Sequence, residues 1–585
     1  MILQALHQLY IRLAENPANG LPKPGYSLQG ISFKVVLHPD GRLHEIQPVK
    51  DESGRSVPTI VPGGAKPSGQ GINPCFLWDN TGYMLGFKPD DPKPERTAKT
   101  FEAFRQKHLE LEKEIQSKAF HAVCRFLDSW QPEKGCEHPA LVATKTGFGV
   151  FQILATPGYV HDDPFIESWW EKQTPLIEEG EKGLCLVTGE LSVLAKLHDP
   201  AIKGVIGAQS SGAKLVSFNL DAFTSYGKEQ SFNAPVSEAA AFAYCTALNH
   251  LLASESRRFR VGDTTTVFWT EKPSEAEDLL PFMMDNTREV PEDTTLKVRL
   301  QSVMEKIASG KLVGDDLGDA KTRFYILGLA PNASRLSIRF WHTSTLGDLA
   351  TNLQKHQDDL AIVREWDEMN SKHPDPKVPG HYVLLRHTAR DADGIPPLLG
   401  GALIRSILLG TPYPDALYQK VMSRVRVAEK DRNGNPTARV PYLRAAIIKA
   451  YLNRNHQLHI PMSLDTTRTE PAYLLGRLFA AIEKVQQEAL GDVNASIGDR
   501  FYSAASATPA AVFSRLLRTH RHHLAKLEGG LRIVREKLVQ DINSGLIGFP
   551  SHLNLQQQGL FAIGYYHQRK DLFTKRDKTT ENTAA

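Results

Sequence analysis

The chain changes character at Phe324-Tyr325-Ile326-Leu327-Gly328-Leu329, a run of strand-forming residues that the turn Pro331-Asn332 separates from a second such run, Leu336 to Trp341. Strand-forming runs on both sides of a Pro-Asn turn predict a β-hairpin. Upstream of it, helix and strand patterns interleave irregularly, whereas downstream of it strand signals nearly vanish. The sequence therefore predicts an α+β fold, with an irregular mixed α/β N-terminal body followed by an all-α C-terminal helical bundle.

The N-terminal body is predicted from several short patterns. An amphipathic first helix precedes a strand over Ile31 to Leu37, and strand patterns return at Cys75 to Trp78 and at Leu215 to Asn219. Helical periodicity covers residues 101–127 and 237–252, and Ser237 is placed to cap the second of these helices. Because strands and helices do not alternate regularly, a doubly wound parallel sheet is not expected.

The C-terminal half is predicted to be helical over residues 346–368, 398–409, 416–429, 440–454, 473–490, 510–526 and 531–542. We expect three domains, at residues 1–343, 344–460 and 461–585. Met462 follows Pro461 at the start of the last block and is a candidate start of a separate small helical product. The alternative is that it is an ordinary internal methionine.

Composition excludes several classes of protein. The chain has 585 residues, 41% of them hydrophobic, which is enough for several cores. It shows no signal peptide and no apolar stretch of membrane-spanning length, so we expect a cytoplasmic protein without membrane contact. Five scattered cysteines without a CxxC pair predict reduced thiols and no metal site or other cofactor. Cys185, in the strand-like segment Cys185 to Glu190, is interpreted as a core cysteine, and the alternative is the relic of a metal-binding knuckle.

The net charge is only +3, so any binding of nucleic acid must come from local basic patches. The strongest patch is Phe501 to Gln540, with seven Lys and Arg against two Glu. On its predicted helix, four cationic side chains recur at three- and four-residue spacing opposite an apolar face: Arg515, Arg518, His522 and Lys526. This stripe either binds a nucleic-acid strand or is a solvated helix face.

A glycine-rich loop, Lys66 to Pro74, is the second candidate. Glycines let a backbone approach a DNA duplex, and Lys66, Ser68, Gln70 and Asn73 offer groups for phosphates and base edges. The loop is not a phosphate-binding P-loop, because its lysine precedes the glycines. The alternative is a solvated surface loop.

A segment from Gly207 to Gln230 combines glycines with amide, hydroxyl and basic side chains but lacks any catalytic constellation. Its candidate DNA contacts are Gln209, Ser210, Ser211, Lys214, Asn219, Lys228 and Gln230. Alternatively, its glycines and Asn219 only shape turns. A short basic cluster, Arg257, Arg258 and Arg260, is a further candidate for phosphate contact or is simply solvated. Arg335 and Arg339 are assigned to fold maintenance.

Seven stretches carry a family resemblance: Asn73 to Gly86, Ile202 to Asn219, Tyr226 to Gln230, Asn233 to Glu238, Gly262 to Trp269, Phe324 to Trp341 and Gly559 to Arg569. They span nearly the whole chain. In these stretches the sequence resembles the large subunit of the type I-C CRISPR Cascade surveillance complex. Gly71-Ile72-Asn73 departs from the Gly-Ile-Lys-Pro-Asn order of that family, which leaves the base-reading residue open.

The resemblance implies a subunit that reads the protospacer-adjacent motif of double-stranded target DNA through the 66–74 loop and the 207–230 segment. It implies that the C-terminal bundle holds the displaced non-target strand. The implied partners are a guide RNA, backbone and guide-processing subunits, a small helical subunit made by internal translation, and a separate helicase-nuclease. The chain itself is expected to break no bond and to have no catalytic residues.

Two other interpretations remain open. A metal-dependent nuclease would use acidic residues, and the chain carries the doublets Asp162-Asp163, Asp315-Asp316 and Asp358-Asp359. Paired acids are also common at helix starts and on solvated surfaces. A structural scaffold without DNA contact is the other alternative.

Overall fold

The structure is a computed structural model. It describes residues 1–573, except 53, 65, 67–70, 145, 174–179, 262–263, 285–293, 313, 365–374, 428–436 and 492–495. The chain packs into two compact units: unit 1 is Met1–Glu255 with Leu329–Trp341, and unit 2 is Ser256–Gly328 with His342–Ala585. The domain boundaries at 343 and 460 stay predictions, since a packing unit need not fold independently.

Unit 1 contains a five-stranded mixed sheet centred on β1 (Tyr26–Leu37). β1 pairs antiparallel with β2 (Leu43–Pro48) and β3 (Val57–Pro62), and parallel with β5 (Phe148–Ile153). β5 in turn pairs antiparallel with β4 (Trp78–Asn80). The predicted strand over Ile31 to Leu37 is therefore present and extends further toward the N-terminus. The strand predicted over Cys75 to Trp78 is wrong for its first three residues, since the strand begins only at Trp78.

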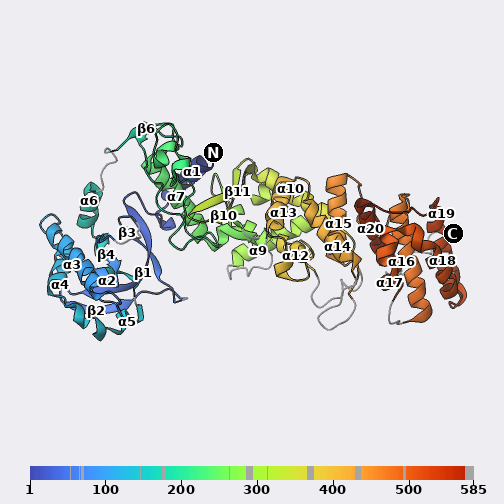
Figure 1. The fold of residues 1–585 in the computed structure, drawn as a ribbon, viewed down its shortest axis with the longest axis horizontal. Helices are drawn as coiled ribbons and strands as arrows, with labels where there is room; N and C mark the ends of the chain where they lie inside the picture. The colour runs from blue at the N-terminus through green and yellow to red at the C-terminus, as the bar shows by residue number, and fades with distance from the viewer. Residues whose placement is uncertain are drawn as a thin grey trace. The chain divides into compact units, whose positions relative to one another are not determined.

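Helices cover this sheet and bury its apolar residues (Figure 1). They are α2 (Thr81–Met84), α3 (Pro94–Leu111), α4 (Lys118–Ser129) and α5 (Pro139–Thr144). The single helix predicted over residues 101–127 is wrong in one respect: the chain breaks after Leu111, and Ser117 starts a new helix by accepting a hydrogen bond from the backbone N–H of Phe120.

The rest of unit 1 is built on α1 (Ile2–Ala14), which packs against α7 (Glu238–Ala253). Ser237 caps α7 as predicted, accepting from the N–H of Ala240 at 3.2 Å. Short helices occupy the connections: η1 (Pro17–Asn19), η2 (Pro132–Glu137), η3 (Val160–Asp162), α6 (Pro164–Gln173), η4 (Asp221–Phe223) and η5 (Gln230–Asn233).

Two strand predictions in this part are wrong. Leu215 to Asn219 forms no strand, because only single bridges, Ile202 with Ala213 and Lys214 with Arg335, tie this region down. Cys185 to Glu190 is the turn between β6 (Lys182–Leu184) and β7 (Leu191–Val193), in which Cys185 N–H donates to the Glu190 carbonyl at 2.9 Å. Cys185 is nevertheless fully buried, as a core cysteine should be.

The predicted hairpin is confirmed and is longer than expected: β10 (Arg323–Asn332) turns into β11 (Arg335–Thr345). Together with β8 (Arg258–Val261) and β9 (Thr264–Thr270) it forms a sheet of order β11-β10-β9-β8. All seven residues of β9 are buried, as in a strand covered on both faces. Between β8 and β10 lie α8 (Ala276–Met284), α9 (Thr294–Ala308) and η7 (Gly314–Leu317).

After the hairpin the described chain is helical, so the α+β prediction is confirmed. The elements are α10 (Leu346–Leu360), α12 (His381–Arg386), η8 (Ala392–Gly394), α13 (Pro397–Leu409), α14 (Asp415–Arg426), α15 (Tyr442–His456), α16 (Pro471–Leu490), α17 (Ile497–Ala507), α18 (Pro509–Leu524), α19 (Gly529–Ser544) and α20 (Leu555–Phe573). Three of these helices, α12, α17 and α20, were not predicted from periodicity. In the described part of the chain, no helix has both the length and the apolar character needed to cross a membrane.

Two glycines allow α16 and α20 to pack against each other backbone to backbone (Figure 1). A Cβ on Gly476 would lie 2.0 Å from the Phe561 carbonyl oxygen, and one on Gly564 would lie 2.2 Å from that of Tyr473. The two backbones therefore touch, and only glycine fits at the crossing. Met462 lies exposed in the loop before α16, and its role as an internal start stays a prediction.

Candidate nucleic-acid interface

The 66–74 loop is anchored through Lys66, whose side chain points into the protein. Its ammonium group forms an ion pair with the fully buried Asp79, donates to the Asn73 carbonyl at 2.6 Å, and lies 3.3 Å from the centre of the Tyr83 ring. Burial raises the pKa of Asp79, and the hydrogen bonds from Cys75, Lys66 and Asn80 oppose that rise. The ammonium group of Lys66, which the sequence analysis offered as a DNA contact, is therefore occupied by contacts within the protein.

Side chains from α2 and α3 also hold the backbone of this loop. Lys107 donates to the Pro74 carbonyl at 2.8 Å, and Tyr83 accepts from the Asn73 N–H at 3.3 Å. The Asn73 side chain itself is exposed. Ser68 and Gln70, the other predicted contacts, lie outside the described residues. Asn73 therefore remains the described side chain of this loop that is placed to meet a ligand.

A buried histidine fixes the end of the loop. His108 accepts a hydrogen bond from the Leu77 N–H at Nε2 (3.0 Å) and donates from Nδ1 to the Phe104 carbonyl (2.7 Å). Leu77 has a φ of +62°, which a leucine rarely adopts, so this contact supports a strained turn. Burial lowers the pKa of His108 to about 3, because the charged ring would lose its solvation. A protonated Nε2 also could not accept the hydrogen bond from the Leu77 N–H.

The 207–230 segment is partly exposed and partly used by the fold. Lys214 forms an ion pair with Asp199 and donates to the His198 carbonyl at 2.8 Å, so this cation has internal partners. Gln209, Ser210 and Ser211 are exposed in a turn closed by the Gly212 N–H and the Gln209 carbonyl at 2.9 Å. Asn219 is exposed as well.

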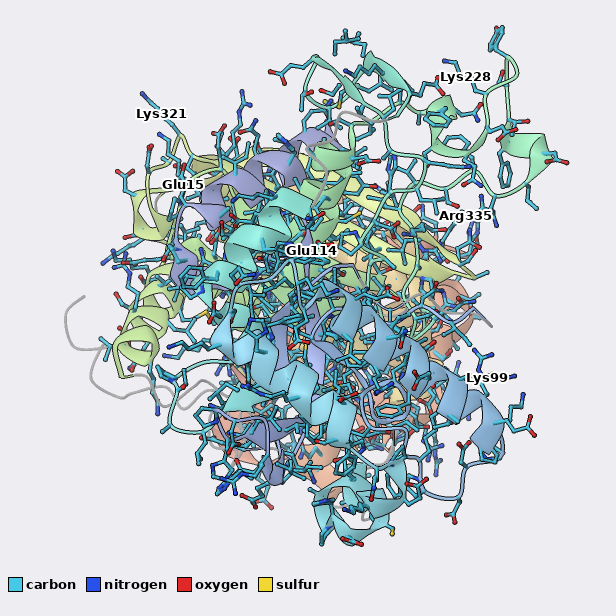
Figure 2. All side chains as sticks on the ribbon, turned by 90° about the vertical axis from the view of Figure 1, so that its left-hand side faces the viewer. Glu15, Lys99, Glu114, Lys228, Lys321 and Arg335 are labelled. Carbon is cyan, nitrogen blue, oxygen red and sulfur yellow. The ribbon has the colours of Figure 1, made fainter. Side chains whose placement is uncertain are left out.

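The same segment ends in a two-residue hairpin, Ser225 to Lys228. Lys228 is exposed, and no ion pair of it occurs among the described residues. Gln230 is half-buried and its carbonyl accepts from the side chain of Asn233 at 2.9 Å. Arg335 lies over the ring of Phe223, 4.5 Å from its centre, and Figure 2 shows Lys228 and Arg335 on the same flank of that view.

The basic cluster of unit 2 is divided by its secondary structure. Arg257 precedes β8, in η6 (Glu255–Arg257), and forms an ion pair with the buried Glu277. Arg258 and Arg260 lie on one face of β8, opposite the buried Phe259, as the alternation predicts. Arg260 is exposed and Arg258 half-buried. This places two of the three guanidinium groups on a strand face.

The α18 stripe is exposed along its whole length. Arg515, Arg518, His522 and Lys526 are all exposed, while Val512, Phe513, Leu516 and Leu524 are buried on the opposite side. In the described part of the chain none of these four basic side chains forms an ion pair with a carboxylate. Arg515 lies 5.4 Å from the centre of the Phe501 ring, which holds its guanidinium group against the surface. Lys526 lies just beyond the helix, which ends at Leu524.

The structure also adds residues that sequence reasoning missed. Arg521 is exposed on α18 three residues after Arg518, and its spacing was visible in the sequence. Lys107 and Arg96 support the 66–74 loop from α3, and Arg96 approaches the Gly71 carbonyl at 3.5 Å. Tyr226, at the tip of the Ser225 to Lys228 hairpin, is 99% exposed. The contacts of Lys107 and Arg96 and the exposure of Tyr226 become visible only in the folded structure.

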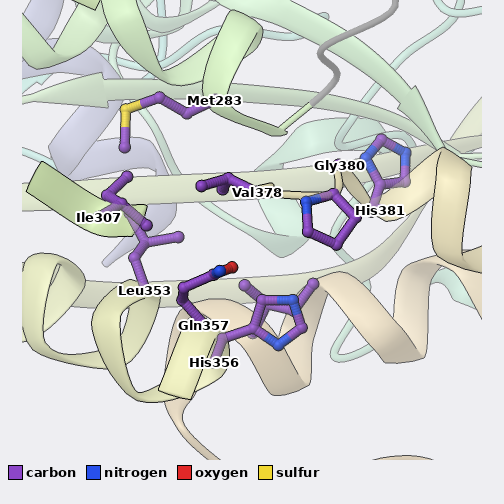
Figure 3. Close-up of a pocket in the computed structure, with 10 residues that line it drawn as sticks. Met283, Ile307, Leu353, His356, Gln357, Val378, Gly380 and His381 are labelled. Atoms are coloured by element: carbon purple, nitrogen blue, oxygen red, sulfur yellow. The ribbon is translucent and has the colours of Figure 1, made fainter. Parts of the chain in front are cut away.

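A small cavity in unit 2 does not suit a ligand (Figure 3). It encloses about 20 Å³ between Met283, Ile307, Leu353, His356 and His381. This is room for about one water molecule. His356 donates or accepts at Nδ1 with the Tyr413 hydroxyl at 2.6 Å, and burial lowers its pKa to about 3. Its Nε2 and the Gln357 Oε1 have no hydrogen-bond partner among the described residues.

The aspartate doublets have structural partners. Asp163 starts α6 by accepting from the N–H of Phe165 at 2.9 Å, and Asp316 forms an ion pair with Lys306. Asp359 pairs with Arg454 at 2.6 Å. Among the described residues, no group of three His, Cys, Asp or Glu is arranged to hold a metal ion.

The chain matches a known protein family over most of its length. A family model described as CRISPR-associated protein (Cas_Csd1) matches residues 6–573. This match covers both packing units and every candidate site above. No curated protein matches the chain significantly.

Proposed function

The chain belongs to the CRISPR-associated Cas_Csd1 family, and on this premise we propose that it is the large subunit of an RNA-guided type I-C Cascade complex. In this proposal it reads the protospacer-adjacent motif in double-stranded target DNA, helps to open the duplex and holds the non-target strand. Base pairing with the guide RNA reads the rest of the target.

The observation that carries the proposal is the contrast between the two kinds of predicted cation. Lys66, Lys214 and Arg257 have carboxylate partners in the chain itself, buried ones for Lys66 and Arg257 and an exposed one, Asp199, for Lys214. The α18 stripe, in contrast, is exposed and has no carboxylate partner in the described chain. Exposed cations at three- and four-residue spacing match a flexible phosphate backbone, so the stripe supports binding of a single strand.

The 66–74 loop supports the reading of a flanking motif. Its carbonyl groups are held by Lys66, Lys107 and Arg96, while the Asn73 side chain is left exposed. An asparagine held in a fixed place can make two hydrogen bonds to an adenine edge in the major groove. We assign Asn73 as the first candidate for a base-reading residue, with Gln209 and Ser210 as neutral hydrogen-bonding groups elsewhere in unit 1.

The proposed assembly includes backbone and guide-processing subunits, a small helical subunit and the guide RNA. A separate helicase-nuclease would degrade the bound DNA, so this chain would break no bond. The rival proposal, a metal-dependent nuclease, predicts that purified chain cuts labelled DNA in magnesium and that alanine at the aspartate doublets abolishes the cutting. Absence of cutting by the chain, with binding by the assembly, favours the subunit proposal.

The decisive experiment is a binding assay of the reconstituted complex on guide-matched targets with randomised flanks. We expect Asn73→Ala to change which flank is preferred, with a loss of about 1–3 kcal/mol on the preferred one. Lys99→Ala is the matched control, because this exposed lysine on α3 carries charge and forms no hydrogen bond or ion pair with the described residues of the loop. Binding of matched targets by an assembly that lacks this chain would contradict the proposal.

A further inference from the structure

The hairpin tip at Tyr226 has an unusual backbone. The Lys228 N–H donates to the Ser225 carbonyl at 3.0 Å, and the two central residues, Tyr226 and Gly227, have φ values of +52° and +68°. Two consecutive positive φ angles define the primed hairpin turn, in which Asn-Gly or Gly-Gly is expected. A tyrosine at the first of these positions is sterically strained.

The Tyr226 side chain does not pack against the rest of the described protein. Tyr226 is 99% exposed, and within the described residues its ring contacts no other ring and no cation. An asparagine or glycine there would serve the turn better and would expose less apolar surface. A strained residue whose side chain contributes nothing to the fold points to a role outside the fold.

The turn is nevertheless held firmly. The side chain of Asn233 accepts from the Ser225 N–H at 2.8 Å and donates to the carbonyls of Lys228 at 2.8 Å and Gln230 at 2.9 Å. Three hydrogen bonds from one amide tie both ends of the turn to the following η5 helix. The exposed ring therefore stands on a preorganised support, which lowers the entropy lost on binding.

The surroundings favour a base over a phosphate as the ligand. Lys228 is exposed beside the ring, but so are Asp221 and Glu229, so the hairpin has no excess of positive charge. The Arg335 guanidinium group lies on Phe223, just before the turn. An exposed aromatic ring stacks on nucleobases regardless of sequence, because every base has a π face.

We propose that Tyr226 is a stacking platform for one unpaired base of the target DNA once the duplex has been opened. This inference rests on the proposed function and adds a specific ligand contact to it. The ring would stack on a base that has lost its neighbour, and Lys228 would lie near the adjoining phosphate. The hairpin would thereby stabilise the opened state without reading sequence.

The test uses the reconstituted complex and guide-matched duplexes that carry 2-aminopurine at successive single positions in either strand. This base fluoresces more strongly when it is unstacked. We expect Tyr226→Gly to raise fluorescence at one or two adjacent positions and to weaken target binding by about fivefold to a hundredfold. Tyr226→Phe, which keeps the ring, should differ from the unmodified chain by less than about twofold.

Two controls separate this role from folding. Tyr226→Gly relieves the positive φ, so its thermal unfolding midpoint should be equal to or above that of the unmodified chain. Phe165→Ala removes another exposed aromatic ring of unit 1, 67% exposed on α6, and should leave fluorescence and affinity unchanged.

The outcomes are distinguishable. If the unmodified complex binds target DNA and Tyr226→Gly changes neither fluorescence nor affinity, the stacking inference is wrong and the proposed function stands. If Tyr226→Gly instead loses another protein subunit from the complex while its DNA signals persist, the ring contacts protein and the inference is also wrong. If the unmodified complex fails to bind matched DNA, the proposed function itself fails, and this inference with it.

Discussion

Lys66 forms an ion pair with Asp79, whose side chain has no solvent exposure. The pair joins the glycine-rich loop to the strand β4, which contains Asp79. A cation that the sequence offered to DNA is therefore needed to neutralise a buried charge. Variants of Lys66 in binding assays will report stability as well as DNA contact.

Lys66→Ala should destabilise the protein by about 3 kcal/mol, because it leaves the buried Asp79 carboxylate without its cation. Removing the cation also raises the pKa of Asp79 further. The loss of folding stability is therefore largest at neutral pH, where the buried carboxyl group is charged. It should shrink as the pH falls toward 4 and Asp79 becomes protonated in the folded state. Thermal unfolding of both proteins between pH 4 and 8 checks this.

The double variant Lys66→Met with Asp79→Asn is the matched control for this pair. It removes both charges and should recover most of the lost stability. Lys99→Ala changes the same net charge on an exposed site and should leave the unfolding temperature unchanged. Equal destabilisation by Lys66→Ala and Lys99→Ala would show that the ion pair contributes nothing.

His108 should make unit 1 sensitive to acid. Its folded pKa of about 3 lies below the ordinary value of 6.5, so the folded state binds fewer protons than the unfolded state. The stability that neutral His108 provides is complete above pH 6.5 and is lost as the pH falls toward 3, by up to about 1.4 kcal/mol per pH unit. His108→Leu should be less stable at pH 7, and its deficit should narrow in acid. A deficit that stays constant from pH 7 to 4 would contradict the assigned hydrogen bonds.

Gly564→Ala should disrupt the contact between α16 and α20. The added methyl group would lie 2.2 Å from the Tyr473 carbonyl oxygen, which a backbone cannot avoid, and we expect a loss of about 3 kcal/mol. Gly401→Ala is the control, because its Cβ meets open space within the helix α13. That change should instead stabilise by about 1 kcal/mol. Urea unfolding followed by circular dichroism compares the two.

The α18 stripe should act as a set of independent phosphate contacts. Alanine at Arg515, Arg518 or Lys526 should weaken binding of a displaced strand without changing flank preference. Each change should reduce the slope of log affinity against log salt by about 0.7. Arg42→Ala is the charge-matched control, since Arg42 is exposed on unit 1 and already paired with Asp40. An unchanged salt slope in all three α18 variants would exclude the stripe as a strand-binding surface.

Local patterns predicted a large part of this protein. The β10–β11 hairpin, the Ser237 cap and the helices from α10 to α19, apart from α12 and α17, follow from periodicity and turn residues, which act over a few neighbouring positions. The exposure of Arg515, Arg518 and His522 was equally readable, because a helix places residues three and four apart on one face. Leu215 to Asn219 shows the limit: its alternation suits a strand, but no partner strand pairs with it.

The sequence by itself thus determined the fold class, most helix positions and the cationic face of α18, since these depend on short-range geometry. Tertiary structure alone decided which cations remain available, because the partners of Lys66, Lys214 and Arg257 come from other segments of the chain. It also decided that Tyr226 stands exposed on a strained turn, which depends on the Asn233 side chain reaching back across the hairpin. Contacts between separate segments are set by packing, and no local pattern records them.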